Sequence, residues 1–217
     1  MPFDFGFVSR IAPTLAQGLV TTLALAIPAI VLSGLWGIPV VVGLMARSRS
    51  VARLTAGYVE LVRNTPVLVQ MFFIFFGSGV LGYPLSGFVA AMLALVLQNG
   101  AYVAEIYRGG IRSVTQRQAE AGLALGLTKR KAFRIVVLPQ AFRKVIPSLS
   151  NQGILIIKDT SLAATISVAE LTFQARLLAD RTAAVFEIFF TLALFYLALT
   201  AIFAGAMRLL ERRARIA

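Results

Sequence analysis

The sequence contains neither cysteine nor histidine among its 217 residues. The absence of cysteine excludes disulfides and thiolate metal sites, and the absence of histidine removes the commonest proton shuttle and metal ligand. Acidic residues are also scarce, because 9 Asp and Glu stand against 21 Lys and Arg and leave a net charge of +12. Nucleophilic or metal-dependent catalysis therefore has little to use, and we expect no metal site in this chain.

Hydrophobic residues, in contrast, make up 59% of the chain and occur in long blocks. This share exceeds that of globular proteins and indicates a polytopic membrane protein of one domain, residues 1–217. The first residues lack the basic segment and cleavage site of a signal peptide. The predicted fold class is an all-α membrane protein with five transmembrane helices, over residues 19–45, 54–77, 87–107, 145–171 and 183–207.

The basic residues cluster beside these spans, which favours a membrane protein over a nucleic-acid-binding protein. Sixteen of them fall in loop 46–53, in loop 108–144 and in the tail after residue 207, whereas the opposite side holds three. Cytoplasmic loops carry the excess of Lys and Arg. The predicted location is the plasma (inner) membrane. The N-terminus is predicted to lie outside the cell, and the C-terminus and loop 108–144 are predicted to lie in the cytoplasm.

A polar, patterned segment follows the third predicted span. Thr115 and Gln118 have the spacing of a capping box, and Gly126 lies where a helix would end. The short helix between them would carry Ala119 and Leu123 on one face. This shape suits a groove on another protein, although a solvated loop helix is the alternative.

Two pairs of opposite charges lie within the predicted spans, where an ionisable group costs roughly 2.5–3.5 kcal/mol. Glu60 and Arg63 are three residues apart on one face, which favours an internal ion pair, although the Arg63 fork could also bind a carboxylate. Glu105 and Arg108 have the same spacing near a span end, and a structural pair is the favoured interpretation.

Uncharged and charged polar residues also fall at mid-span. Gln98 and Asn99 could bind a solute or hydrogen-bond between helices. Lys158 and Asp159, followed by the hydroxyl residues Thr160 and Ser161, predict a broken helix. The second half of this helix would present free N–H groups to a substrate carboxylate. The alternative is that the Lys158 side chain extends to the membrane–water interface. Asp159, or a carbonyl freed by Pro66, would hold an ammonium. The candidate binding residues for a zwitterion are Arg63, Gln98, Asn99, Lys158, Asp159, Thr160 and Ser161.

The polar segment resembles the EAA loop of ABC importer permeases. The matching residues are Glu120-Ala121-Gly122, Gly126, Val136 and Leu138-Pro139, with Gly122 in place of alanine and Val136 in place of isoleucine. Further stretches are similar to the polar amino-acid branch of these permeases, the histidine, arginine and glutamine type. They are Arg63-Asn64-Thr65-Pro66 with Gln70, Ala104-Glu105-Ile106 with Arg108-Gly109-Gly110, and residues 158–162, with Asn64 in place of the usual glycine.

The resemblance implies a type I importer permease with a cytoplasmic coupling helix. Its partners would be two ABC ATPase subunits, a second permease copy or paralogue, and an extracytoplasmic binding protein that delivers a polar amino acid. The chain would not be an enzyme and would need no cofactor, because ATP and Mg would be bound by the ATPase; the chain itself has no phosphate-binding G-x-x-x-x-G-K-[ST] loop. The implied ATPase-coupling residues are Glu120, Ala121, Gly122, Gly126, Leu138 and Pro139.

Two other functions remain open on the residues alone. A self-sufficient secondary transporter or channel for a small zwitterionic solute would also use mid-span charges, but it usually shows more spans and an internal repeat. An intramembrane enzyme would lack histidine, cysteine and a G-x-S-x-G nucleophile elbow. Copurification of a nucleotide-binding subunit would separate the importer from both.

Overall fold

The computed structural model describes residues 5–182 and 184–216, and every regular element in this part of the chain is helical. The helices are α1 (Phe5–Leu44), α2 (Arg49–Arg63), α3 (Val67–Val80), α4 (Gly87–Arg112), α5 (Gln116–Ala124), α6 (Lys129–Ala132), α7 (Leu138–Asp159), α8 (Leu171–Thr182) and α9 (Val185–Ile216). A π-helical segment, η1 (Phe133–Val137), precedes α7, and a 3-10 helix, η2 (Thr160–Ile166), follows it. The predicted all-α class is confirmed.

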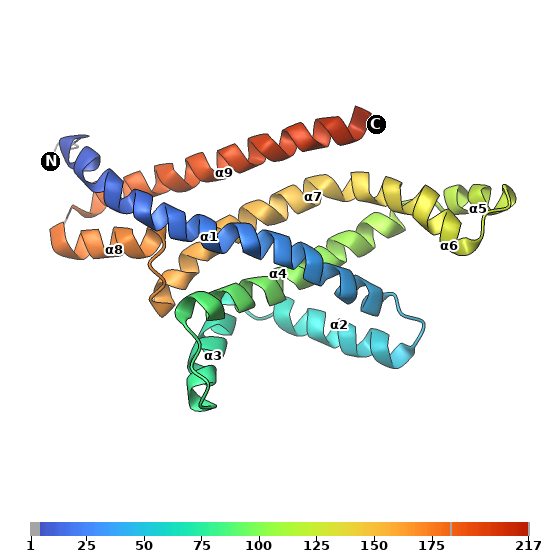
Figure 1. The fold of residues 1–217 in the computed structure, drawn as a ribbon, viewed down its shortest axis with the longest axis horizontal. Helices are drawn as coiled ribbons and strands as arrows, with labels where there is room; N and C mark the ends of the chain where they lie inside the picture. The colour runs from blue at the N-terminus through green and yellow to red at the C-terminus, as the bar shows by residue number, and fades with distance from the viewer. Residues whose placement is uncertain (1–4, 183, 217) are drawn as a thin grey trace.

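Helix α4 lies at the centre of the bundle and crosses α1 there (Figure 1). Small residues make this close approach possible, because Ala90, Ala91 and Ala94 are fully buried. At Gly100 an added Cβ would collide with the indole ring of Trp36 on α1. The most apolar stretch of α4 is 56% buried, whereas that of α9 is only 17% buried. Helix α4 is therefore the core element, and α9 is an outer one.

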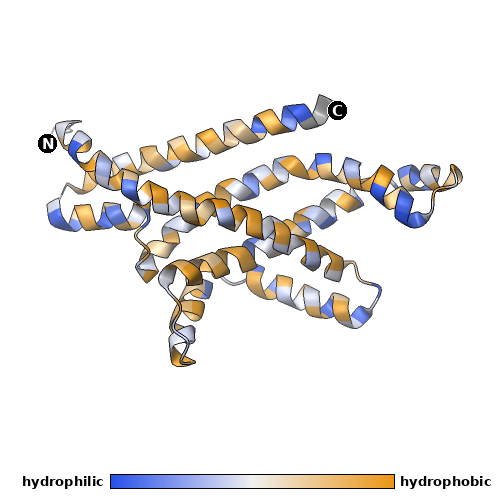
Figure 2. Ribbon diagram, viewed as in Figure 1, coloured by the Kyte–Doolittle hydropathy of each residue, from blue (hydrophilic) through white to orange (hydrophobic). Residues whose placement is uncertain are grey.

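Apolar residues form a belt around the middle of the bundle, and hydrophilic residues gather towards its ends (Figure 2). Large exposed side chains belong to this belt, among them Ile27, Phe73 and Phe190. A water-soluble protein rarely exposes so much contiguous apolar surface. The belt is therefore the surface that faces lipid or other membrane subunits.

The basic segments lie towards one end of the bundle. The α1–α2 connection, the α5–α6 hairpin and the C-terminal part of α9 all point away from α8 and from the beginning of α1 (Figure 1). The three segments that carry most of the basic charge thus lie towards the same end of the bundle (Figure 1), as their predicted common side of the membrane requires. This arrangement agrees with the positive-inside prediction, and the orientation stays a prediction.

The predicted spans correspond unequally to the helices. Three helices, α1, α4 and α9, are long and apolar enough to cross a membrane, and the α2–α3 pair would be a fourth crossing if it is counted as one span. The segment predicted as one span, 54–77, is two helices bent by 100°. With 15 and 14 residues, each is about 20–23 Å long at 1.5 Å per residue, too short to cross a core of about 30 Å alone.

The remaining spans stay predictions in number and bounds. Segment 145–171 comprises the second half of α7, η2 and the turn before α8. Of segment 183–207, residue 183 lies outside the described residues, and 185–207 belong to α9. The predicted absence of a signal peptide likewise concerns residues 1–4, which lie outside the described part of the chain. A count of five crossings is therefore not established by the helices alone.

Candidate functional site

The segment predicted to couple to a partner forms α5, which begins and ends where the sequence predicts. The Thr115 side chain makes no capping hydrogen bond, so the predicted capping box is wrong; the Gln118 N–H donates to the Thr115 carbonyl at 3.0 Å. Gly126 has a φ of +81°; its N–H donates to the Leu123 carbonyl at 2.9 Å, and the next residue's N–H donates to the Gly122 carbonyl at 3.1 Å. These two bonds form a Schellman motif, which confirms that Gly126 ends the helix.

Helix α5 packs on the bundle by one narrow face. Gly122 is buried, and an added Cβ there would lie 3.3 Å from both Ala132 and Val136. Ala119 packs on a small buried cluster at the α4 and α7 ends. The outward face carries Glu120, Ala121 and Ala124, Leu123 lies at its edge and is 40% exposed, and Leu125, directly after the helix, is 84% exposed. The face opposite the small-residue contact is therefore open to a partner.

An irregular helix connects this projection to the bundle. Leu138 and Pro139 begin α7 directly after the π-helical segment η1. Pro139 lacks the backbone N–H that an α-helix would use at this position. A π-helical turn before the proline is one way to accommodate this missing hydrogen bond. The Gln140 side chain also bonds within this junction, because its Nε2 donates to the Val136 carbonyl at 2.9 Å. The Leu-Pro pair thus marks the junction between the projecting hairpin and the long helix.

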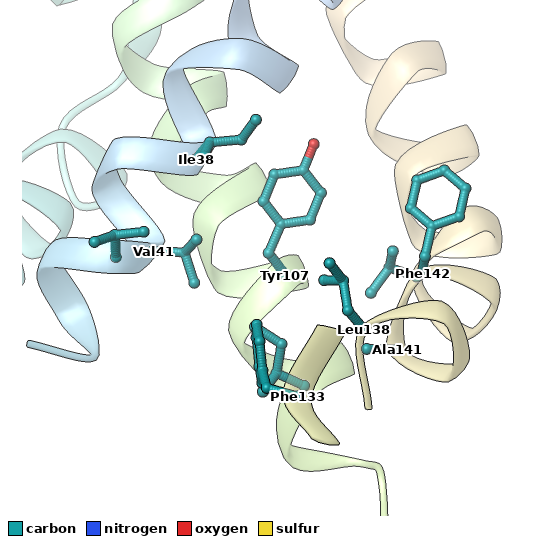
Figure 3. A pocket seen from close by; sticks show the side chains of 10 residues that line it. Ile38, Val41, Tyr107, Phe133, Leu138, Ala141 and Phe142 are labelled. Atoms are coloured by element: carbon teal, nitrogen blue, oxygen red, sulfur yellow. The ribbon is translucent and has the colours of Figure 1, made fainter. Parts of the chain in front are cut away.

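A cavity of about 380 Å³ lies beside this junction, between α1, α4, η1 and α7 (Figure 3). It is lined by Ile38, Val41, Val42, Tyr107, Ile111, Phe133, Leu138, Ala141, Phe142 and Val145. No charged side chain lines it. A zwitterion needs a few convergent polar groups, so this apolar cavity does not suit one.

The two predicted ion pairs have different outcomes. Arg108 donates to Glu105 Oε2 from Nε at 3.0 Å and from Nη2 at 2.6 Å, which confirms that pair. Arg63 is exposed, and its guanidinium lies 4.9 Å from the centre of the Tyr102 ring. Among the described residues it makes no ion pair with Glu60, so that pair is wrong. The Tyr102 ring stabilises the Arg63 guanidinium by a cation–π contact, and this contact leaves the guanidinium N–H groups available to another acceptor.

The amides of Gln98 and Asn99 bond to neighbouring helices. Gln98 Oε1 accepts from Gln70 Nε2 of α3 at 2.8 Å, and Asn99 Oδ1 accepts from Gln152 Nε2 of α7 at 2.6 Å. Asn99 also donates to the Leu95 carbonyl at 2.8 Å and is 1% exposed. The alternative of interhelical hydrogen bonding therefore describes both residues in this conformation.

The break predicted after Lys158 takes a different form. Helix α7 ends at Asp159, but the chain continues directly as a 3-10 helix, with Asp159 itself in helical geometry. The Thr160 N–H donates to the Ile156 carbonyl, and the Ser161 hydroxyl donates to the Lys158 carbonyl at 2.7 Å. Because these groups are satisfied within the helix, the predicted half-helix with free N–H groups is absent.

The structure does not join the predicted binding residues into one contact network. Lys158 is exposed and Asp159 is half-buried. Within the described residues no hydrogen bond or ion pair links Arg63, Gln98 or Asn99 to residues 158–161. Gln98 and Asn99 lie on α4, which shares one apolar cluster with α7 and η2, and Arg63 ends α2, which packs on α4 in a second cluster.

A buried carboxylate escaped the sequence prediction. Glu170 is fully buried at the start of α8, where its Oε1 accepts the Phe173 N–H at 2.8 Å. Its Oε2 accepts the Tyr196 hydroxyl of α9 at 2.9 Å, and the adjacent Leu171 N–H donates to Thr22 of α1 at 3.1 Å. The sequence offered one signal for this role, an acidic residue at the end of a predicted span. A carboxylate at such a position can cap the helix that begins after it.

Long apolar helices and a short helix that projects from the basic end define the membrane subunit of a transporter. The chain belongs to the family of binding-protein-dependent transport system inner membrane components, which it matches over residues 34–216. It is thus a multi-pass inner membrane permease, a transport protein and not a catalytic one.

Relatives in this family are similar over the whole chain. The glutamine transport system permease protein GlnP of Escherichia coli (strain K12) is 37% identical over 227 residues, which cover 100% of both chains. The nopaline transport system permease protein NocM of Agrobacterium fabrum is 36% identical over 96% of this chain and 90% of its own. The resemblance read from the sequence motifs is confirmed.

Solved structures share the fold. A crystal structure of an amino acid ABC transporter with histidines superposes with a TM-score of 0.92 at 34% identity, over 98% of this chain and 100% of that one. An inward-facing form of the MetNI methionine ABC transporter gives a TM-score of 0.80 at 18% identity, over 94% of this chain and 98% of the other. The fold is that of type I ABC importer permeases.

Proposed function

We propose that this chain is the permease subunit of an ATP-driven importer for polar amino acids. The full-length match to amino-acid permeases carries the proposal. An extracytoplasmic binding protein delivers the substrate, and separate ATPase subunits bind ATP and Mg and drive the cycle. The permease pairs with a second copy or a paralogue, with its N-terminus outside and its C-terminus in the cytoplasm.

The outward face of α5 docks on the ATPase. Gly122 and Ala119 on its inner face pack against the rest of the chain. Glu120 and Ala121 on its outer face are exposed, beside the exposed Leu125. An exposed leucine next to a carboxylate suits an apolar groove on the partner that has basic residues at its edge. The irregular helix at Leu138 and Pro139 then transmits the push of the ATPase into α7.

The substrate binds at mid-depth among Arg63, Gln98, Asn99 and residues 158–161. Lys158 and Arg63 hold the α-carboxylate, because both cations are exposed and the guanidinium fork is free of a carboxylate partner. Asp159 holds the α-ammonium once the helix opens at the point where α7 changes to η2. The burial of Asn99 belongs to the resting conformation, and its amide becomes available when α7 moves.

Reconstitution tests the function. The permease, the ATPase and the binding protein are placed in proteoliposomes, and ATP-dependent uptake of radiolabelled polar amino acids is measured. Glu120→Lys should abolish uptake while leaving membrane insertion intact, because α5 lies outside the bilayer. Asp180→Lys, the same charge reversal on exposed α8, is the matched control and should transport normally. Normal uptake by Glu120→Lys would exclude the docking role, and no uptake by the native complex would exclude the importer itself.

A further inference from the structure

The break between α2 and α3 contains a side chain that replaces a missing backbone bond. Pro66 has no N–H, and in an unbroken α-helix that N–H would donate to the Val62 carbonyl. Gln70 Nε2 donates to this carbonyl instead, at 2.8 Å. The same nitrogen lies 3.1 Å from the Thr65 carbonyl and 2.8 Å from Gln98 Oε1 on α4. An amide has two hydrogens, so its donor capacity is fully used by these three acceptors.

The other carbonyls at the end of α2 are satisfied as well. The Asn64 N–H donates to Glu60 at 3.0 Å, the Thr65 hydroxyl donates to Leu61 at 2.8 Å, and the Tyr102 hydroxyl of α4 donates to Arg63 at 3.3 Å. The last four carbonyls of a helix have no partner within it, so each needs such a donor. This helix end is therefore a fully capped structure, although it lies in a segment bent by 100°.

Helix α2 is also fixed upstream of the break. Trp36 Nε1 of α1 donates to the Tyr58 hydroxyl at 2.8 Å, and that hydroxyl donates to the Leu97 carbonyl of α4 at 2.6 Å. Helix α2 is thus tied to α1 and α4 without Gln70. Among the bonds at the break, the Gln70 amide is the one that starts on α3 and reaches both α2 and α4.

We propose that Gln70 is a positioning residue that sets the angle between α2 and α3 and the place of the Gln98 side chain. Arg63 and Gln98, on either side of this amide, then keep the relative positions that substrate binding requires. The proposal rests on the proposed function. In the membrane no water replaces a lost donor, so an unpaired Val62 carbonyl drives the break to rearrange, and α3 moves because α2 is held.

Spin-label distances test the geometry directly. The chain has no cysteine, so Leu54→Cys on α2 and Val80→Cys on α3 give two unique label sites, 78% and 88% exposed. Distances are measured by pulsed EPR in the assembled importer in lipid. Gln70→Met keeps the shape and removes the donors, and it should broaden and shift the distribution. Val69→Met places the same new side chain at the neighbouring, 50% exposed position of α3 and removes none of the hydrogen bonds at the break, so this matched control should keep the native distribution.

Uptake kinetics separate positioning from packing. Gln70→Met should raise the KM for amino-acid uptake about tenfold, while basal ATPase activity and assembly remain native. Should Gln70→Met fail to assemble, Gln70→Asn keeps the amide on a shorter arm and should shift the distances in the same direction. Native distances and a native KM in whichever variant assembles overturn the proposal. If the unaltered complex imports no amino acid, the proposed function fails instead, whatever the distances show.

Discussion

Two adjacent amides show how single residues hold this bundle together. Gln98 and Asn99 follow one another on α4, and about 100° of helix rotation directs the first to Gln70 of α3 and the second to Gln152 of α7. Interhelical hydrogen bonds of this kind contribute on average about 0.6 kcal/mol in a membrane. Such weak bonds can be exchanged during a transport cycle, so these amides are suited to hold the resting state and then meet a substrate.

Lys158 should matter for substrate affinity more than for assembly, because its side chain is exposed. Lys158→Ala removes one charge-assisted bond to the substrate carboxylate, of about 1.5–3 kcal/mol, and should raise the KM for uptake by about tenfold to hundredfold. Lys158→Arg keeps the charge and should lie near the native value. An unchanged KM in Lys158→Ala would remove this residue from the site, and a failure to assemble would make it a structural partner.

Glu170 should matter for stability, because its carboxylate joins α8 and α9 beside a bond to α1. Glu170→Leu removes a helix cap and the carboxylate that accepts from the Tyr196 hydroxyl, which keeps only its 3.1 Å contact with the Thr172 hydroxyl, and this should cost about 1–3 kcal/mol. The change is read as a lower melting temperature of the purified permease. Glu170→Gln retains a carbonyl oxygen for the Phe173 N–H and a donor for Tyr196, so it should melt much closer to the native chain. Equal melting of Leu and Gln variants would contradict this role.

At the scale of elements, local rules predict α5 well and the bent segments poorly. Gly126 ended α5 as expected because the left-handed conformation is a property of one residue. A freed carbonyl at Pro66 was predicted but the 100° bend was not, since this region makes contacts with Gln98 and Tyr102 of α4 that no local pattern contains. The change from α- to 3-10 helix at Asp159 likewise depends on packing around η2, which no local pattern contains.

The same reasoning explains which binding residues could be predicted. The polarity of Gln98, Asn99 and Lys158 in apolar spans was enough to single them out. Their partners were not predictable, because hydrogen bonds from Gln70 and Gln152 join residues 28 and 53 positions apart. Glu170 was missed because it was counted as the end of a span rather than as the cap of the next helix.

Gly126 gives a test of α5 as an element. An added Cβ there would meet nothing within 4 Å, so any effect of substitution comes from its φ of +81° and not from crowding. Gly126→Val should destabilise the Schellman turn by about 1–2 kcal/mol and reduce ATP-driven uptake, while the permease still inserts. Gly126→Asn tolerates the left-handed conformation and should retain most uptake. Equal activity of the two variants would show that the helix end is not needed for coupling.

At the scale of the whole molecule, charge and shape give the same division into two ends. The α1–α2 connection, the α5–α6 hairpin and the end of α9 lie towards one end, and α8 lies at the other (Figure 1). Cytoplasmic ends of membrane proteins carry the excess of Lys and Arg. If the hairpin docks on the ATPase as proposed, it must also lie where ATP is available. Both arguments predict that the same end faces the cytoplasm.

Topology reporters test this orientation. Alkaline phosphatase, which is active outside the cytoplasm, and green fluorescent protein, which is fluorescent inside it, are fused after residue 217 and inserted in the α8–α9 connection at residue 183. The C-terminal fusion should be fluorescent and inactive as a phosphatase, and the insertion at residue 183 should show the reverse, because one helix, α9, separates the two sites. A phosphatase-active C-terminus would show that the orientation is the reverse of the predicted one. Helix α5 would then lie outside the cytoplasm, away from ATP, and could not dock on an ATPase. Equal signals at both sites would mean that α9 does not cross the membrane, against its length of 32 residues, or about 48 Å.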